Sequence, residues 1–181
     1  MPSGCPIWAW RHPKPHGVAG RCVGHTDVVV DRRKAKRLAH RVRQAARLHG
    51  LPKVVYTSPL QRCRTVGRIL QAWGWRHHID ARLAEMDFGA WDGKPWLDIN
   101  RHQIDAWVAD FVGYQPGGGE SLGQVLKRAQ AWQATGPGPV VVIGHAGWML
   151  ARQWVNEHES PPDGAHHWPT PPAYGHCWPL R

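Results

Sequence analysis

The sequence predicts an α/β fold, a three-layer α/β/α sandwich built around a mostly parallel central sheet. Short apolar runs that suit buried strands occur at residues 7–10, 54–57 and 140–143. Each run is followed by a stretch with helical character, and this alternation is typical of parallel sheets covered on both faces. At 181 residues the chain is long enough for one domain with a sizeable core. We therefore expect residues 1–181 to form a single domain.

The first half of the chain is predicted to contain two strand–helix pairs. After the first strand, residues 13–27 form a loop rich in glycine, proline and histidine, and so long a loop is usually functional. Asp31 suits a helix N-cap, and the apolar stripe after it ends at Gly50, so we expect a helix between them. The second strand ends at Ser58, and a helix with proline in its first turn then runs toward Trp73.

The second half is predicted to begin with a short strand near residues 78–80 and an irregular, glycine-broken stretch. A helix is expected from about Trp96 to Phe111, and another after Ser121, which suits an N-cap. The last apolar run then forms a strand that leads into a final helix. From about residue 160 the chain is rich in proline and histidine, and we expect an irregular tail. The side chains expected to face inward from the helix at 96–111 are Ile99, Ile104, Trp107, Val108 and Phe111.

Composition and charge narrow the choice of partner. Hydrophobic residues make up 42% of the chain and charged residues 20%, which is the balance of a globular protein. The net charge of +10 favours an anionic partner: nucleic acid, an acidic membrane surface or a phosphorylated small molecule. Much of this charge lies at residues 31–47, which we interpret as the solvated face of one helix.

Several features favour a soluble protein of the cytoplasm. No apolar run approaches the ~20 residues that a membrane helix needs, so we expect no membrane partner. The first six residues lack the basic and apolar regions of a signal peptide. The cysteines show neither CxxC pairing nor metal-ligand spacing, so we expect reduced thiols and no disulfide framework. They are Cys5, Cys22, Cys63 and Cys177.

Two histidines follow apolar strands. Arg11-His12 ends the first apolar run, and Gly144-His145 follows the valine-rich run at 140–143. Ligands of open α/β sheets bind outside the carboxyl ends of the strands. With arginines nearby, we interpret the two histidines as parts of an anion-binding site. A purely structural histidine bonded to the backbone is the alternative for His145.

Further motifs accompany these two histidines in order along the chain. They are Arg11-His12, Gly24-His25-Thr26-Asp27, Ser58-Pro59-Leu60-Gln61-Arg62, Glu85 in a Leu-x-Glu-x-x-Phe-Gly-x-Trp-x-Gly stretch, Pro116-Gly117-Gly118-Gly119-Glu120-Ser121, and Gly144-His145. Together they resemble the histidine phosphatase superfamily, with its phosphoglycerate-mutase-like fold, over residues 6–151. The resemblance is closest to the alpha-ribazole phosphatase branch, the phosphatases associated with cobalamin synthesis.

The resemblance implies specific roles for five residues, and the position of a helix start adds a sixth. His12 would be the nucleophile that takes the phosphoryl group, and Glu85 would donate a proton to the leaving oxygen. The phosphate would be bound by Arg11, Arg62 and His145. Phosphoryl transfer depends mostly on positioning and positive charge, and a carboxylic acid assists a poor leaving group. His145 supplies a full charge only when protonated, and the backbone amide of Ala146 adds a donor at a helix start.

The motif after His12 departs from the family. Many relatives have glycine at the next position, whereas this chain has Pro13-Lys14-Pro15, in which proline fixes the backbone. The departure bears on the substrate more than on the chemistry. Mutases of the family tend to be longer, so the short chain favours a phosphomonoesterase that works through phosphohistidine. Alpha-ribazole 5′-phosphate is the first candidate substrate, and another small phosphate ester, such as a sugar or nucleotide, is the alternative.

Three polar residues near the motifs have local explanations. Ser58 is interpreted as the cap of the helix that begins at Pro59. Asp87 and Asp92 are interpreted as hydrogen-bond acceptors in the loop that carries Glu85. If Glu85 is not the proton donor, these two aspartates are the next candidates.

Other interpretations remain open on the sequence alone. A basic nucleic-acid-binding domain that uses residues 32–47 is the rival from a different class, although we expect no nucleic acid as a partner. No His/Cys set has zinc-like spacing, so we predict no metal and no cofactor. Trp91 and Trp96 are candidates for stacking on a flat substrate group, and whether they or the 13–27 loop contact substrate stays open. The oligomeric state stays open.

Overall fold

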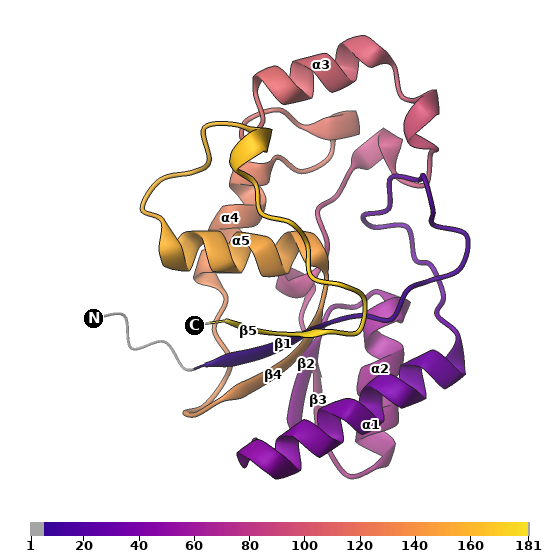
Figure 1. Cartoon of the computed structure of the whole chain (residues 1–181), viewed down its shortest axis with the longest axis vertical. Coiled ribbons are helices and arrows are strands. Elements are labelled where there is room, and N and C mark those ends of the chain that lie inside the picture. The colour runs from indigo at the N-terminus through magenta and orange to yellow at the C-terminus, as the bar shows by residue number, and fades with distance from the viewer. Residues whose placement is uncertain (1–5, 181) are drawn as a thin grey trace.

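Five strands form the central sheet: β1 (Ile7–Arg11), β2 (Val54–Thr57), β3 (Arg76–Ile79), β4 (Val140–Gly144) and β5 (Cys177–Leu180). The computed structural model describes residues 6–180. The strand order is β3-β2-β4-β1-β5 (Figure 1). The first four strands run parallel, and β5 pairs antiparallel with β1 at the edge. The predicted α/β fold with a mostly parallel sheet is confirmed.

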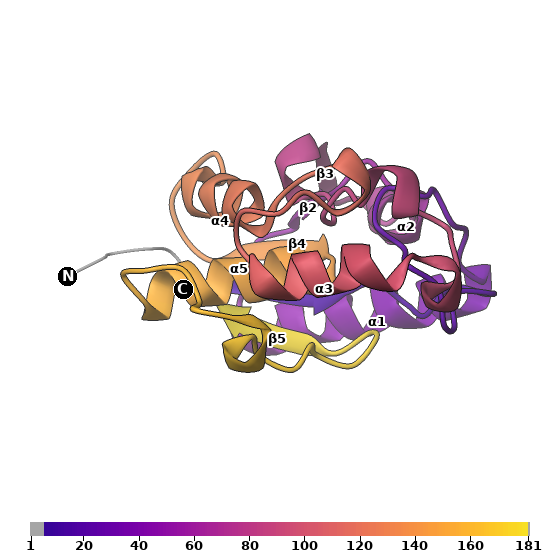
Figure 2. The same cartoon turned by 90° about the horizontal axis from the view of Figure 1, so that it is seen from above.

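Four helices cover the sheet: α1 (Arg32–His49), α2 (Gln61–Ala72), α4 (Leu122–Ala131) and α5 (Ala146–Glu157). Successive side chains of a strand point to opposite faces. Val140 and Val142 of β4 therefore pack into the core with α4 and α5, whereas Val141 and Ile143 pack into the core with α1 and α2. Figure 1 shows α4 and α5 on one side of the sheet and α1 and α2 on the other, and Figure 2 views the same layers from the side of α4 and α5. Burial on both faces is the reason that β4 is a continuous apolar run.

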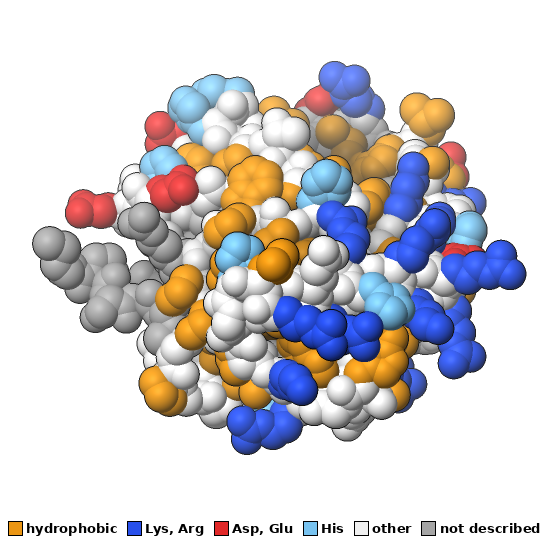
Figure 3. Space-filling model, turned by 60° about the horizontal axis from the view of Figure 1, so that its bottom comes forward, with side chains coloured by type: hydrophobic (Ala, Val, Ile, Leu, Met, Phe, Trp, Pro, Cys, Tyr) orange, Lys and Arg blue, Asp and Glu red, His pale blue; other side chains and the backbone are white. Residues whose placement is uncertain are grey.

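Local signals set the ends of α1. The Asp31 side chain accepts a hydrogen bond from the backbone N–H of Lys34 (2.9 Å), and Gly50 follows the helix with a φ of 63°. A positive φ favours glycine at this position. Lys and Arg side chains of α1 lie outside the core, and Figure 3 shows such side chains gathered on this face of the molecule. The predicted caps and solvated basic face are confirmed.

The helix expected from Trp96 to Phe111 is shorter than predicted. A short 3-10 turn at Trp96–Asp98 precedes α3 (Arg101–Ala109), because the Asn100 side chain caps α3 by accepting from the backbone N–H of His102. Figure 1 shows α3 at the opposite end of the molecule from α1. The inward orientation expected for Val108 is wrong, since that side chain is 57% exposed. Ile99, Ile104 and Trp107 do face inward, into a small cluster with Cys22 and Trp91, and Phe111 packs against the main core.

The tail from residue 160 is not irregular throughout, which corrects the prediction. A 3-10 turn forms at Ala165–His167, and β5 pairs with β1 through partners such as Leu180 with Ile7. Pro179 lies within β5. Proline within a strand is mostly confined to sheet edges, so its presence argues against a strand in the sequence. The edge position of β5 meets this condition.

Two further findings bear on the composition-based expectations. Cys22, Cys63 and Cys177 are free thiols, and Cys5 lies outside the described residues. Within residues 6–180, the helices are too short or too polar to cross a membrane.

Candidate active site

The carboxyl ends of β1 and β4 bring the two predicted histidines together. These strands are parallel neighbours with Arg11 opposite Gly144, and the backbone N–H of His12 donates to the carbonyl of Gly144 (3.0 Å). The ring centroids of His12 and His145 are 5.1 Å apart, and both side chains are buried. The two histidines thus share one site at the edge of the sheet where α/β proteins bind ligands.

His12 is held as a neutral imidazole. Its Nδ1 lies 2.8 Å from the carbonyl oxygen of Pro13, and because a carbonyl only accepts, Nδ1 carries the proton. Burial and the positive charges of Arg62 and Arg11 lower the pKa of His12 to about 3. At neutral pH, Nε2 therefore has a free lone pair, which a nucleophile requires.

Arg62, in the first turn of α2, is fixed by three hydrogen bonds. Nε donates to Nδ1 of His145 (3.2 Å), Nη1 donates to the carbonyl of Thr26 (2.9 Å), and Nη2 donates to the carbonyl of Gly24 (2.5 Å). A guanidinium has five N–H donors, so two remain for a ligand. The side chain is only 1% exposed, yet it lines a cavity beside His12. A fixed cation with free donors suits a phosphate group.

His145 is also a neutral imidazole. Its Nδ1 accepts from Arg62, so the proton of the neutral ring lies on Nε2, 2.6 Å from Oγ of Ser58. Burial and the positive charge of Arg62 keep the pKa of His145 well below its usual value. His145 therefore carries no full positive charge with which to bind phosphate at neutral pH. In this geometry His145 orients Arg62.

Ser58 is a residue of the site that the sequence interpretation assigned to a helix cap. Leu60, not Ser58, is the N-cap of α2, and Ser58 Oγ accepts only a long bond from the Leu60 backbone N–H (3.3 Å). Its short contact is with His145, 87 positions away. The signal that could have identified it is its place at the end of β2, which neighbours β4.

The loop around Gly24 is shaped by Asp92. The carboxylate accepts from the backbone N–H groups of Gly24 (3.1 Å), His25 (2.5 Å) and Thr26 (2.9 Å), and from Thr26 Oγ1. Burial alone would raise the pKa of Asp92, but these hydrogen bonds outweigh it and lower the pKa. The carbonyls that this loop presents are those that hold Arg62. The interpretation of Asp92 as a loop acceptor is confirmed.

Glu85 lies against the start of α5. Its Oε2 accepts from the backbone N–H of Gly147 (3.2 Å) and its Oε1 from that of Met86 (3.1 Å). A Cβ atom at position 147 would clash with Oε1, so only glycine permits this approach. The backbone before it is held by Arg128, which donates to the carbonyls of Ala84 (2.7 Å) and Glu85 (3.1 Å). Gly147 and Arg128 are contributors that the sequence analysis missed.

Arg11 and the described groups meet at a cavity of about 190 Å³. His12, Arg62 and Glu85 line it together with Arg11, as predicted, whereas His145 lies behind Arg62. The remaining wall consists of Pro15, Val18, Arg21, Val23, Phe88, Trp96 and Tyr174. The cavity is therefore cationic at the histidine, and its remaining wall combines aromatic and aliphatic side chains with a third arginine, Arg21.

The two tryptophans near Glu85 have different environments. Trp91 is 2% exposed and packs with Cys22 and Ile99, so it does not face a ligand. Trp96 is 38% exposed and lines the cavity, as do residues of the 13–27 loop.

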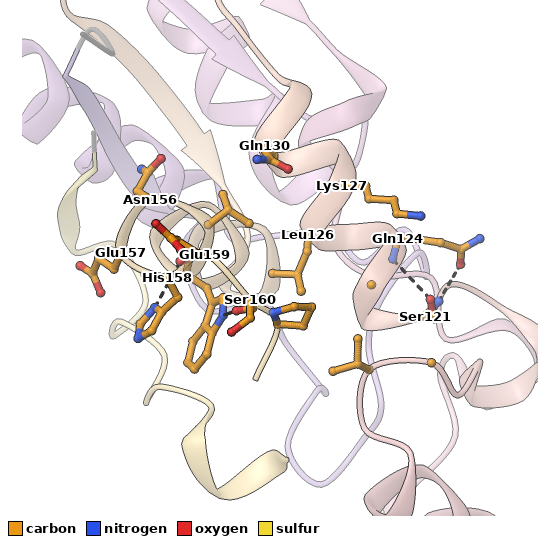
Figure 4. A pocket seen from close by; sticks show the side chains of 16 residues that line it. Ser121, Gln124, Leu126, Lys127, Gln130, Asn156, Glu157, His158, Glu159 and Ser160 are labelled. Atoms are coloured by element: carbon orange, nitrogen blue, oxygen red, sulfur yellow. Dashed lines mark hydrogen bonds between the residues drawn. The ribbon is translucent and has the colours of Figure 1, made fainter. Parts of the chain in front are cut away.

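A larger hollow, of about 850 Å³, lies elsewhere, between α4 and the end of α5 (Figure 4). Gln124, Lys127 and His158 are among its lining residues, and none of the six predicted site residues is. Its size does not make it the site, because the groups suited to phosphate chemistry surround the smaller cavity. Across the described part of the chain, no three His, Cys, Asp or Glu side chains are grouped as a metal site.

The fold and this cavity define an α/β protein with a cationic cavity at the carboxyl ends of parallel strands. Residues 7–170 match the model of the histidine phosphatase superfamily (branch 1), and the chain belongs to this family. The phosphoglycerate-mutase-like fold and the family are thereby confirmed, and membership supports a phosphatase.

Solved structures agree with this assignment. TTHB049 from Thermus thermophilus is similar, with 28% identity and a TM-score of 0.64 over 82% of each chain. Mycobacterial hydrolase 1 has 25% identity and a TM-score of 0.64, over 82% of this chain and 76% of its own. The mycobacterial glucosyl-3-phosphoglycerate phosphatase Rv2419c has 23% identity and a TM-score of 0.63, over 81% and 76%, and shows the fold alone. Comparison with curated proteins gives no match.

Proposed function

We propose that this protein is a phosphomonoesterase that works through a phosphohistidine on His12. The observation that carries the proposal is a neutral His12, with Nε2 unprotonated, in a cavity that three arginines also line, Arg11 and Arg62 among them. A phosphate monoester entering this cavity would meet the nucleophile and two guanidinium groups at once. Arginine forks match phosphate oxygens, and they supply the positive charge that phosphoryl transfer needs without a metal ion.

In the first step, the Nε2 lone pair attacks phosphorus and the bond from phosphorus to the ester oxygen breaks. Glu85, in its protonated form, gives its proton to that oxygen, so an alcohol leaves. The Nδ1–H bond of His12 to Pro13 stays in place and supports the phosphorylated ring. In the second step, a water molecule attacks phosphorus while ionised Glu85 takes its proton, and the N–P bond breaks to give phosphate and His12. Arg11 and Arg62 stabilise the charge of the transferring group in both steps.

The proposed substrate is a small phosphate ester, with alpha-ribazole 5′-phosphate as the first candidate and a sugar or nucleotide ester as the alternative. The motif resemblance supports the first candidate. The partly exposed Trp96 and the Phe88 ring in the cavity wall support a flat alcohol part, because such rings favour stacking. We expect the enzyme to act in the cytoplasm.

A trapping experiment tests the mechanism. Rapid quenching in alkali after mixing with a ³²P-labelled ester should leave label on the peptide that contains His12, since phosphohistidine survives base. The assay is run in a strong chelator, where labelling should persist. H12A should abolish the label, whereas H102A, on the exposed surface of α3, should retain it. Label on Ser58, or full turnover by H12A, would contradict the proposal.

A further inference from the structure

The side chain of Arg11 is held by a segment far along the chain. Its Nη1 donates to the carbonyl of Pro172 (2.8 Å), 161 positions away. The guanidinium carbon lies 3.8 Å from the centre of the Tyr174 ring, which is the geometry of a cation–π contact. One edge and one face of the guanidinium are thus occupied by residues 172–174.

The same segment is tied to the backbone of Arg11. The backbone N–H of Arg11 donates to the carbonyl of His176 (3.1 Å), and the N–H of Gly175 donates to the carbonyl of Arg11 (2.9 Å). Gly175 has a φ of 72°, a conformation that favours glycine, and the chain turns there into β5. Tyr174 is therefore placed by main-chain bonds to the residue whose side chain it covers.

The guanidinium of Arg11 still has a hydrogen-bond donor available for a ligand. Nε of Arg11 is buried and has no hydrogen-bond partner among the described residues. Both Arg11 and Tyr174 line the cavity, and the ring of Tyr174 is 5.4 Å from that of His12. A buried donor without a partner is costly, and a phosphate oxygen would satisfy it.

We propose that Tyr174 is a positioning residue of the phosphate site, which holds the Arg11 guanidinium so that its unpaired donors meet the phosphate. The inference rests on the proposed phosphatase function. Tyr174 acts through the face of its ring: among residues 6–180 no hydrogen bond involves its hydroxyl, so phenylalanine should replace it. An aliphatic side chain of similar bulk fills the space but lacks the ring's attraction for a cation.

The test compares Y174F and Y174L in kcat/KM for 4-nitrophenyl phosphate and in the Kd for inorganic phosphate, measured by calorimetry. Y174F should match the wild type within about twofold. Y174L should lose about 3- to 30-fold in both quantities, which is the range expected for a partly desolvated cation–π contact. The matched control is W168L, because Trp168 lies in the same tail but packs against Phe111 and Trp154. W168L should leave phosphate affinity unchanged even where it lowers the melting temperature.

A double-mutant cycle separates positioning from general destabilisation. In an R11Q background, Y174L should cost little further activity, because the group it orients is gone. Multiplied losses in R11Q/Y174L, or equal losses in Y174F and Y174L, would overturn the proposal. If the wild type fails to turn over any ester, the phosphatase proposal fails, and the phosphate affinities of Y174F and Y174L still decide the role of Tyr174. Unchanged affinity in Y174L would then reject it.

Discussion

Two groups of cations in this protein have the same charge and opposite settings. Arg62 is 1% exposed, and three of its donors bond to the protein. The α1 cations, such as Arg33 and Arg37, are exposed, and none of the ion pairs found among the described residues involves them. A buried guanidinium must be hydrogen-bonded, and those bonds also fix where its free donors lie. An exposed one is solvated and has no fixed geometry.

The comparison explains why net charge alone is a poor guide to the site. The +10 charge indicates an anionic partner, yet α1 carries eight of the 23 Lys and Arg residues outside the cavity. The cavity itself is lined by Arg11, Arg21 and Arg62. The arginines with fixed partners, rather than the most numerous ones, are expected to govern activity.

The largest effect is expected from R62Q. Loss of the buried cation should lower kcat/KM for 4-nitrophenyl phosphate by about 10²–10³-fold, as for the removal of one donor to a transition-state oxyanion. Because Arg62 lowers the pKa of His12, its removal should raise that pKa. Protonated His12 is not a nucleophile, so the acid limb of the pH–rate profile should move to higher pH.

R68Q is the matched control, since Arg68 is exposed on the same helix. It should leave both the rate and the pH profile close to those of the wild type. An R62Q enzyme that is properly folded, by its melting temperature, but retains wild-type kcat/KM would exclude Arg62 from the site.

The next effect depends on the substrate. E85Q keeps the shape of the side chain but removes the acid, so an alkyl phosphate should lose about 10²-fold or more in kcat/KM. A nitrophenyl phosphate should lose far less, because nitrophenolate leaves without a proton. D87N is the control, because Asp87 is nearby and accepts from the backbone N–H of Gly89. It should slow both esters alike if at all. Equal losses for the two esters in E85Q would show that Glu85 is not the proton donor.

The smallest effect is expected on α1. The triple variant R33Q/K36Q/R37Q removes three exposed cations and should change kcat/KM by less than about twofold at physiological salt, where surface charges are screened. The wild type should show no salt-sensitive binding to a single-stranded or duplex oligonucleotide. Tight binding that weakens steeply with salt, and that the triple variant loses, would instead support the nucleic-acid alternative.

Local signals in the sequence were sufficient for the parts that depend on near neighbours. The Asp31 cap and the Gly50 end of α1 appear as predicted. The apolar runs before His12 and His145 form buried parallel strands. A strand buried on both faces is a nearly continuous apolar run, so it can be recognised in the sequence before its neighbouring strands are known. His12, Arg11, Arg62 and Glu85 meet at one cavity, as the motif order implied. The chemical role of each remains a proposal.

Long-range contacts decided the remainder. Ser58 bonds His145 only because β2 and β4 are neighbours, and Glu85 approaches Gly147 only because α5 begins beside its loop. The neutral state of His145 follows from burial, which no motif records. Tyr174 contacts Arg11 just before the edge strand β5. Because β5 contains proline, its sequence pattern does not predict a strand. Periodicity and caps act over a few residues, whereas pairing of distant segments depends on the surfaces that the folded sheet presents.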